Sequence, residues 1–161
     1  MIAATCGGLR GIRISPSTIR ERLMPSLQER LASVLRDVLP VEEEPDGALT
    51  IRHDGTFASL RVVTIVEDLD LVSLTQVLAW DLPLSKKIRD RVAEHAQGVQ
   101  LGSLTVVEKV SDTSAKRNSG KTADVMLRYN FPGAGLTDDA LRTLILMVLD
   151  TGAEIRRALT R

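Results

Sequence analysis

The residues of this chain that could carry chemistry are few and scattered. His53 adjoins Asp54, an arrangement that an acid–base pair could use. Asp54-Gly55, however, stands between two runs with strand-like alternation, and this dipeptide is typical of a two-residue hairpin turn. His53 has no second histidine or nucleophile nearby, and His95 has no matching ligand at helical spacing. We therefore interpret Asp54 as a turn residue and both histidines as surface residues.

Two further clusters invite a metal or phosphate hypothesis. The acidic stretch 42–46 (EEEPD) offers oxygen ligands, but neighbouring carboxylates followed by proline form no recognisable cation loop, so we interpret it as a solvated connector. Residues 120–122 (GKT) end like a P-loop, yet Ala115 replaces the glycine that the motif needs, and a strand pattern follows instead of a helix. Cys6 is the single cysteine, so no intrachain disulfide can form. These residue types predict no catalytic residue, no metal ion and no cofactor.

Composition narrows the class of partner. Lys and Arg total 21, as do Asp and Glu, so the net charge gives no indication of nucleic acid or membrane binding. The chain lacks the apolar run of a secretory signal, and no segment approaches the roughly 18 apolar residues of a membrane span. At 161 residues, it fits one domain. We expect a cytoplasmic protein that does not associate with membranes.

The stretch 56–80 predicts two long strands joined at Glu67-Asp68. Apolar residues alternate along both strands, as one buried sheet face requires. The predicted inward set is Ala58, Leu60, Val62, Val66, Val72, Leu74, Leu78 and Trp80. The opposite parity is only half polar, which is unusual for a solvated sheet face and predicts a partner surface.

Helical patterns flank these strands. Stripes of apolar residues predict helices over about 25–39, 86–97 and 137–159, and further strands over 101–110 and 123–131. The first helical stripe comprises Leu27, Leu31, Val34, Leu35 and Val38. With the strand before Asp54 included, the order is α-β-β-β-α-β-β-α, which predicts an α+β domain with helices packed on one face of an antiparallel sheet. Residues 1–15 are predicted to be a flexible lead-in, and residues 16–161 a single domain.

The layout resembles the YbjN-like proteins, which share the fold of the class I type III secretion chaperones. The resemblance covers about 27–159 and is carried by LQERLASVLRDVL, IRHDGTFASLRVV, WDLP and GLTDDALRTLILMVL. Gly102 fits the glycine-led strand of the family, whereas EHAQGVQ lacks the asparagine that the family often has in its middle helix. The resemblance implies a non-enzymatic, often dimeric domain that binds peptides or partner proteins.

The leading hypothesis is therefore a chaperone-like or adaptor domain, a homodimer that binds a protein or peptide client. Its candidate surface is the outward sheet face together with the last helix. The candidate residues are Val63, Ile65, Val77, Val107, Met126, Leu146 and Met147. The alternatives are a small enzyme or ligand-binding regulator with an unrecognised site, and nucleic-acid binding through the basic 112–122 loop, which the few aromatic residues disfavour.

Overall fold

The computed structural model of the chain describes residues 25–109 and 121–161. The predicted lead-in 1–15 and most of the 112–122 loop lie outside these ranges. The described helices and strands are α2 (Leu27–Arg36), β1 (Val41–Glu43), β2 (Leu49–His53), β3 (Thr56–Val66), β4 (Leu69–Pro83), α3 (Lys86–Gly98), β5 (Ser103–Lys109), β6 (Thr122–Pro132) and α4 (Asp138–Leu159). None of these helices is both long and apolar enough to cross a membrane.

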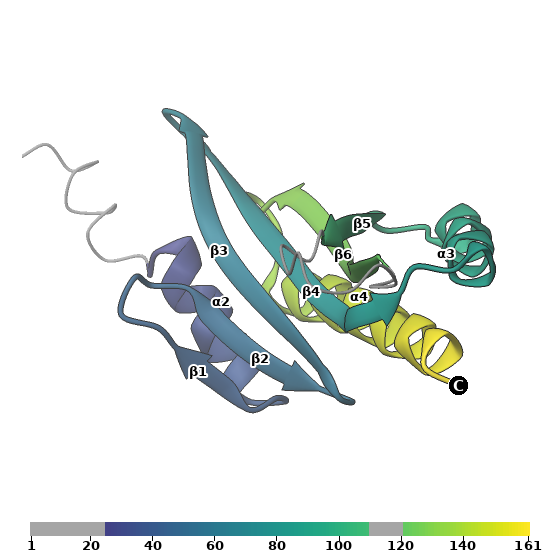
Figure 1. Cartoon of the computed structure of the whole chain (residues 1–161). Coiled ribbons are helices and arrows are strands. Elements are labelled where there is room, and N and C mark those ends of the chain that lie inside the picture. The colour runs from purple at the N-terminus through teal and green to yellow at the C-terminus, as the bar shows by residue number, and fades with distance from the viewer. Residues whose placement is uncertain (1–24, 110–120) are drawn as a thin grey trace, which may run out of the picture.

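All six described strands form one antiparallel sheet in the order β1-β2-β3-β4-β6-β5. In Figure 1, α2 and α4 lie behind this sheet, and α3 packs beside β5 and α4. We call the face that α2 and α4 cover the inner face, and the opposite one the outer face. The predicted α+β class and helix placement are confirmed.

The sheet has one strand more than predicted. Val41–Glu43 pairs with β2 as β1, although the sequence suggested a solvated connector there. Arg36 forms an ion pair with Glu43, and Glu44 accepts a hydrogen bond from the Thr50 hydroxyl at 2.8 Å. These contacts hold the acidic stretch against its neighbour while Glu42 and Glu43 stay exposed.

Local signals determine where the helices begin. Ser26 caps α2 in a capping box with Glu29, and Thr137 caps α4. The α2 helix ends at Arg36 and not near residue 39, so Val38 leaves the predicted stripe and is exposed. The other positions of that stripe pack against α4 and the inner face of the sheet.

The Asp54-Gly55 turn is confirmed. Asp54 and Gly55 have φ values of 44° and 76°, as expected for the two central residues of a tight hairpin turn. His53 and Thr56 form the closing pair of β2 and β3. The positive φ is the reason that the chain uses aspartate and glycine at this point.

Two register shifts change which side chains face the helices. The β3–β4 register slips between Thr64 and Val66, and the β4–β6 register slips between Val77 and Ala79 and again between Ala79 and Leu82. Strict alternation placed Val66 and Trp80 in the core, but each follows a slip, and both are exposed. At Trp80 the slip moves the side chain to the outer face, whereas Val66 lies near the tip of the β3–β4 hairpin, where Thr64, which precedes the slip, is exposed as well.

The rest of the alternation is confirmed on the inner face. Leu60, Leu74 and Leu127 are fully buried beneath α4, whose Ile145 and Val148 face them. Each fully buried aliphatic side chain contributes about 1.5–3 kcal/mol to folding. This core fixes the sheet as a rigid platform for its outer face.

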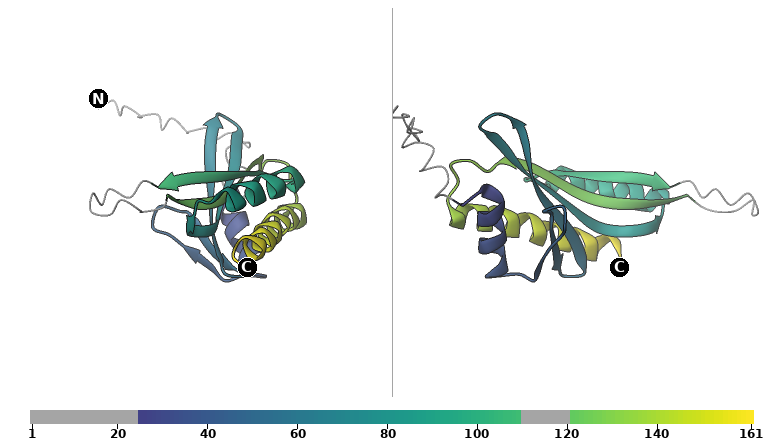
Figure 2. Two further views of the ribbon diagram at one scale, coloured as in Figure 1. Left: turned by 45° about the vertical axis from the view of Figure 1, so that its right-hand side comes forward. Right: turned by 90° about the vertical axis from the view of Figure 1, so that its left-hand side faces the viewer.

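The β3–β4 hairpin projects beyond the other strands. From Arg61 onward β3 pairs only with β4, because its pairing with β2 stops at Leu60. Figure 2 shows the hairpin reaching past the helices and the remaining strands in both views. The outer face thus has a broad central part and a narrow extension.

Candidate functional site

A row of side chains crosses the centre of the outer face. Arg52 pairs with Phe57, Phe57 with Val77, Val77 with Met126, and Met126 with Thr105, so the row spans five strands. Paired residues of adjacent strands place their side chains on the same face, about 5 Å apart. The guanidinium carbon of Arg52 lies 5.4 Å from the Phe57 ring centroid, within cation–π range.

Trp80 adds a second ring to this row. Its ring centroid lies 5.4 Å from that of Phe57 at an interplanar angle of 60°, an edge-to-face arrangement. Trp80 is 45% exposed and Phe57 is 39% exposed. We use the name outer patch for Phe57, Val77, Trp80, Val107 and Met126.

A charged cluster borders the outer patch beside Val107. The Lys109 ammonium contacts the carboxylates of Asp81 and Asp124, each at 2.9 Å. Asp124 also accepts a hydrogen bond of 3.0 Å from the backbone amide of Asp81, whose φ is +51°. The cluster therefore holds the distorted end of β4 that positions Trp80.

The pKa of the Asp124 carboxyl is lowered by this cluster. Burial alone would raise it, but the hydrogen bonds from Lys109 and from the Asp81 amide, with the charge of Lys109, outweigh burial. The pKa of Lys109 is raised, chiefly by its hydrogen bonds to Asp124 and Asp81. Each group thus favours the charged form of its partner.

Acid should remove the stabilisation that Asp124 provides. A carboxylate with a depressed folded pKa stabilises the protein above its unfolded pKa, about 3.9, and loses this effect as the pH falls toward the folded pKa. We expect Asp124→Asn to be less stable than the wild type at pH 7, and the difference to shrink below about pH 4. Urea unfolding across that range measures it, with Asp90→Asn in α3 as the control. A difference that stays constant with pH would contradict the ion-pair role.

The seven candidate residues from the sequence occupy three places. Val77, Val107 and Met126 lie in the outer patch, whereas Val63 and Ile65 lie on the projecting hairpin. Two polar rows separate these zones; they contain Ser59, Thr75, Arg128, Ser103, Arg61, Ser73 and Asn130. Phe57 and Val63 are six residues apart on one strand, which corresponds to about 20 Å. Leu146 and Met147 lie on α4, on the opposite side of the sheet, and Met147 is 49% exposed.

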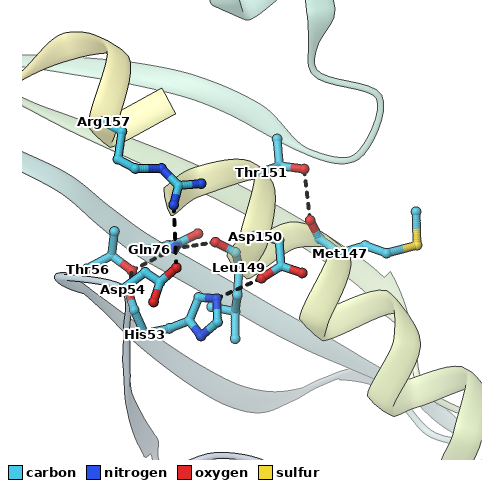
Figure 3. A network of polar contacts seen from close by, with 9 residues as sticks. All are labelled: His53, Asp54, Thr56, Gln76, Met147, Leu149, Asp150, Thr151 and Arg157. Atoms are coloured by element: carbon cyan, nitrogen blue, oxygen red, sulfur yellow. Dashed lines mark hydrogen bonds and ion pairs between the residues drawn. The ribbon is translucent and has the colours of Figure 1, made fainter. Parts of the chain in front are cut away.

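His53 contacts a different carboxylate from the one beside it in sequence. Its Nε2 lies 2.8 Å from Oδ1 of Asp150 in α4, while Asp54 faces Arg157 at 3.7 Å (Figure 3). The nearby Thr56 hydroxyl donates to the backbone carbonyl of His53, and not to its imidazole. The contacts tie the β2–β3 turn to α4 without forming a nucleophile–base pair. Among the residues described, no three His, Cys, Asp or Glu side chains gather in a metal-binding arrangement.

Sequence reasoning missed the aromatic part of the outer patch. Phe57 shares the parity of Ser59 and Val63, so alternation could have placed it on the outer face. Trp80 carried no such signal, because the register shift that exposes it depends on pairing with β6. The P-loop hypothesis for residues 120–122 was rejected partly because the sequence predicts a strand after them. The structure has that strand, since β6 begins at Thr122.

Comparison with known proteins gives a likeness at the level of fold. No family model and no curated protein matches the sequence. A solved structure of YbjN, a proposed transcription regulator from E. coli, superposes with a TM-score of 0.54. The match covers 84% of this chain and 92% of that chain, at 11% sequence identity. The resemblance seen in the sequence is therefore confirmed for the architecture, and the chain has the fold of YbjN.

Proposed function

We propose that the chain is a non-catalytic, chaperone-like or adaptor domain that binds a protein or peptide partner on the outer patch. The observation that carries this proposal is the exposed Phe57–Trp80 ring pair in the middle of a rigid sheet face. Large exposed apolar groups on a fixed platform are typical of interaction sites. Tryptophan and arginine are enriched among the residues that dominate binding energies.

The side chains of the outer patch indicate which kind of segment would bind there. The rings and the neighbouring Val77 and Met126 suit apolar or aromatic side chains, which would leave water on binding. Arg52 and Arg128 lie on the row of the patch and on the adjacent row, so an acidic group beside the apolar anchor would complement them. We therefore expect an apolar segment with flanking acidic residues. The regulatory role proposed for YbjN is compatible with a module that acts by holding such a partner.

The test places a charge in the outer patch. Peptides selected from a random displayed library against the wild type should bind Met126→Asp at least about 30-fold more weakly, since a central truncation or charge costs about 2 kcal/mol or more. Fluorescence anisotropy of a labelled peptide measures the affinity. Val107→Asp, on the edge strand β5, is a second variant; because it places a carboxylate opposite Asp124, its stability is compared with that of the wild type before its affinity is interpreted.

Thr143→Asp supplies the matched control, because Thr143 is exposed on α4 and lies away from the outer face. It should bind the selected peptides like the wild type. Circular dichroism and thermal unfolding establish that each variant is folded. Equal binding by Met126→Asp, Val107→Asp and the control would contradict the proposed site, as would a selection that yields no peptide.

A further inference from the structure

A surface cavity of about 370 Å³ lies where the end of β4, the start of α3 and the end of α4 meet. In Figure 1, these three segments come together on the right-hand side of the molecule. The volume falls within the range of small-molecule sites, about 300–1,000 Å³. None of the lining residues belongs to the outer patch, so the cavity is a second, separate feature of the surface.

Every ionisable side chain that lines this cavity is cationic. These side chains are Lys87 and Arg91 of α3, and Arg161, which follows α4. Among the described residues, no side-chain carboxylate lies within ion-pair distance of any of the three. The whole chain has 21 basic and 21 acidic residues. The concentration of positive charge at the cavity is therefore a local feature.

The other lysine and arginine of α3 differ from those at the cavity. Lys86 and Arg89 are exposed, and each contacts a carboxylate, at 2.6 Å and 3.3 Å respectively. Arg91 is half-buried instead, and its Nη1 donates to the backbone carbonyl of Arg161 at 3.5 Å. Within the described ranges, α3 thus has its cations neutralised away from the cavity and not neutralised beside it. An anion from outside the chain would supply the missing partner.

The start of α3 adds a hydrogen-bond donor to the same cavity. Ser85 caps the helix, and its hydroxyl oxygen accepts from the amide of Ile88 at 3.3 Å, so the hydroxyl hydrogen is free to donate. The first turn of α3 has no acidic residue, unlike those of α2 and α4, so its positive end keeps its field. Arg156 and Arg157 offset the negative end of α4. The polar lining therefore suits an anion.

The base of the cavity is apolar. Leu159 is 3% exposed and belongs to the core, and Leu82 and Ile88 are partly buried against it. A bare inorganic anion would leave these side chains in contact with water, whereas a ligand with an apolar body would cover them. Three cations favour a group with more than one negative charge. A phosphate monoester has both properties, since its charge at neutral pH is about −1.5 to −2.

We propose that this cavity binds a small phosphate monoester whose organic part is apolar. The phosphoryl group contacts Lys87, Arg91 and Arg161, and the organic part packs against the apolar base. The Ser85 hydroxyl donates to a phosphoryl oxygen. The site makes the chain a ligand-binding domain in addition to its proposed adaptor role, and the proposal does not rest on the outer patch.

Phenyl phosphate is the probe, and isothermal titration calorimetry with the full chain measures its affinity. It should bind at least about 10-fold more tightly than inorganic phosphate, because its ring covers the apolar base. Arg91→Gln should weaken its binding at least about 10-fold, since a charge-assisted hydrogen bond is lost. Arg89→Gln, two residues earlier on the same helix, is the matched control and should bind within about 2-fold of the wild type. Ile88→Ala should weaken the binding of phenyl phosphate but not of inorganic phosphate.

A titration of the wild type avoids any effect of substitution on folding. In amide NMR spectra, the signals of Lys86, Lys87 and Thr160 should shift most as phenyl phosphate is added. Shifts centred elsewhere, equal affinities of Arg91→Gln and Arg89→Gln, or no saturable binding in the millimolar range would each overturn the proposal. Inorganic phosphate that binds as tightly as phenyl phosphate would overturn the role of the apolar base. Peptide binding by the outer patch would be unaffected, so the two proposals fail separately.

Discussion

Gly152→Ala should lower the free energy of unfolding by about 1–3 kcal/mol. Gly152 is buried within α4 where the helix crosses the sheet, and a Cβ atom there would overlap the side-chain amide of Gln76. At an exposed helical site the same change stabilises the protein by up to about 1 kcal/mol, because alanine has the higher helix propensity. A loss of stability would therefore show that steric overlap outweighs helix propensity at this position. Each kcal/mol shifts the melting temperature of a chain of this size by about 2–4 °C.

The Gln76 amide cannot move away easily, because it is fully buried and hydrogen-bonded. Its Nε2 donates to the Thr56 hydroxyl at 2.8 Å and to the Leu149 carbonyl at 3.0 Å (Figure 3). Its Oε1 has no hydrogen-bond partner among the described residues. Glycine at position 152 therefore allows α4 to lie close to a polar side chain of β4. The sequence alone could not show that this glycine is needed for close packing.

A double-mutant cycle separates this overlap from other effects of the substitution. Gln76→Ala removes the amide, so Gly152→Ala should cost less in that background than in the wild type. Gly98→Ala is the matched control, because Gly98 is exposed at the end of α3 and a Cβ there meets nothing within 4 Å. Urea unfolding gives all four values. Strictly additive effects, or a stabilising Gly152→Ala, would contradict the packing argument.

The sheet could be predicted from sequence wherever its ladder is regular. Period-2 alternation placed Ala58, Leu60 and Leu74 in the core because successive side chains of a strand must face opposite sides. Val66 was misplaced because the β3–β4 hairpin extends past the helices (Figure 2), and Trp80 because it follows a register shift. Such a shift is set by the neighbouring strand, and no local pattern in the sequence records it.

The limits of helix and strand prediction have the same origin. The Thr137 cap of α4 and the Asp54-Gly55 turn depend on local sequence alone, so both are predictable without the tertiary structure. The strand at 41–43 forms because β2 lies beside it and Arg36 contacts Glu43. It therefore depends on tertiary contacts, which the local sequence does not reveal. The candidate surface was likewise found only in part. Parity identified Val77 and Met126, but it could not show that the hairpin residues form a separate zone.

Trp80→Ala should weaken partner binding by at least about 30-fold, which corresponds to about 2 kcal/mol. Trp80 offers the largest exposed apolar group of the outer patch, and its contact with Phe57 holds the ring in one orientation before the partner arrives. A pre-positioned ring loses little conformational entropy on binding, so most of its buried area contributes to affinity. Because nearly half of Trp80 is exposed in the free chain, the cost to folding should be smaller than the cost to binding.

The controls for Trp80 follow from the two zones of the outer face. Val63→Ala removes exposed apolar surface on the hairpin, outside the patch, and should leave the affinity within about 2-fold. Trp80→Phe should recover part of the loss, since it keeps an aromatic ring against Phe57. Anisotropy titrations with one selected peptide compare the three variants directly.

The wild-type chain also contains its own probe, because Trp80 is the single tryptophan. If a partner covers the outer patch, the indole leaves water and its emission should move to shorter wavelength as the peptide is added. A peptide that binds Trp80→Ala as tightly as the wild type, and that leaves the wild-type emission unaltered, would place the partner elsewhere on the molecule. The proposed role of the outer patch would then be wrong.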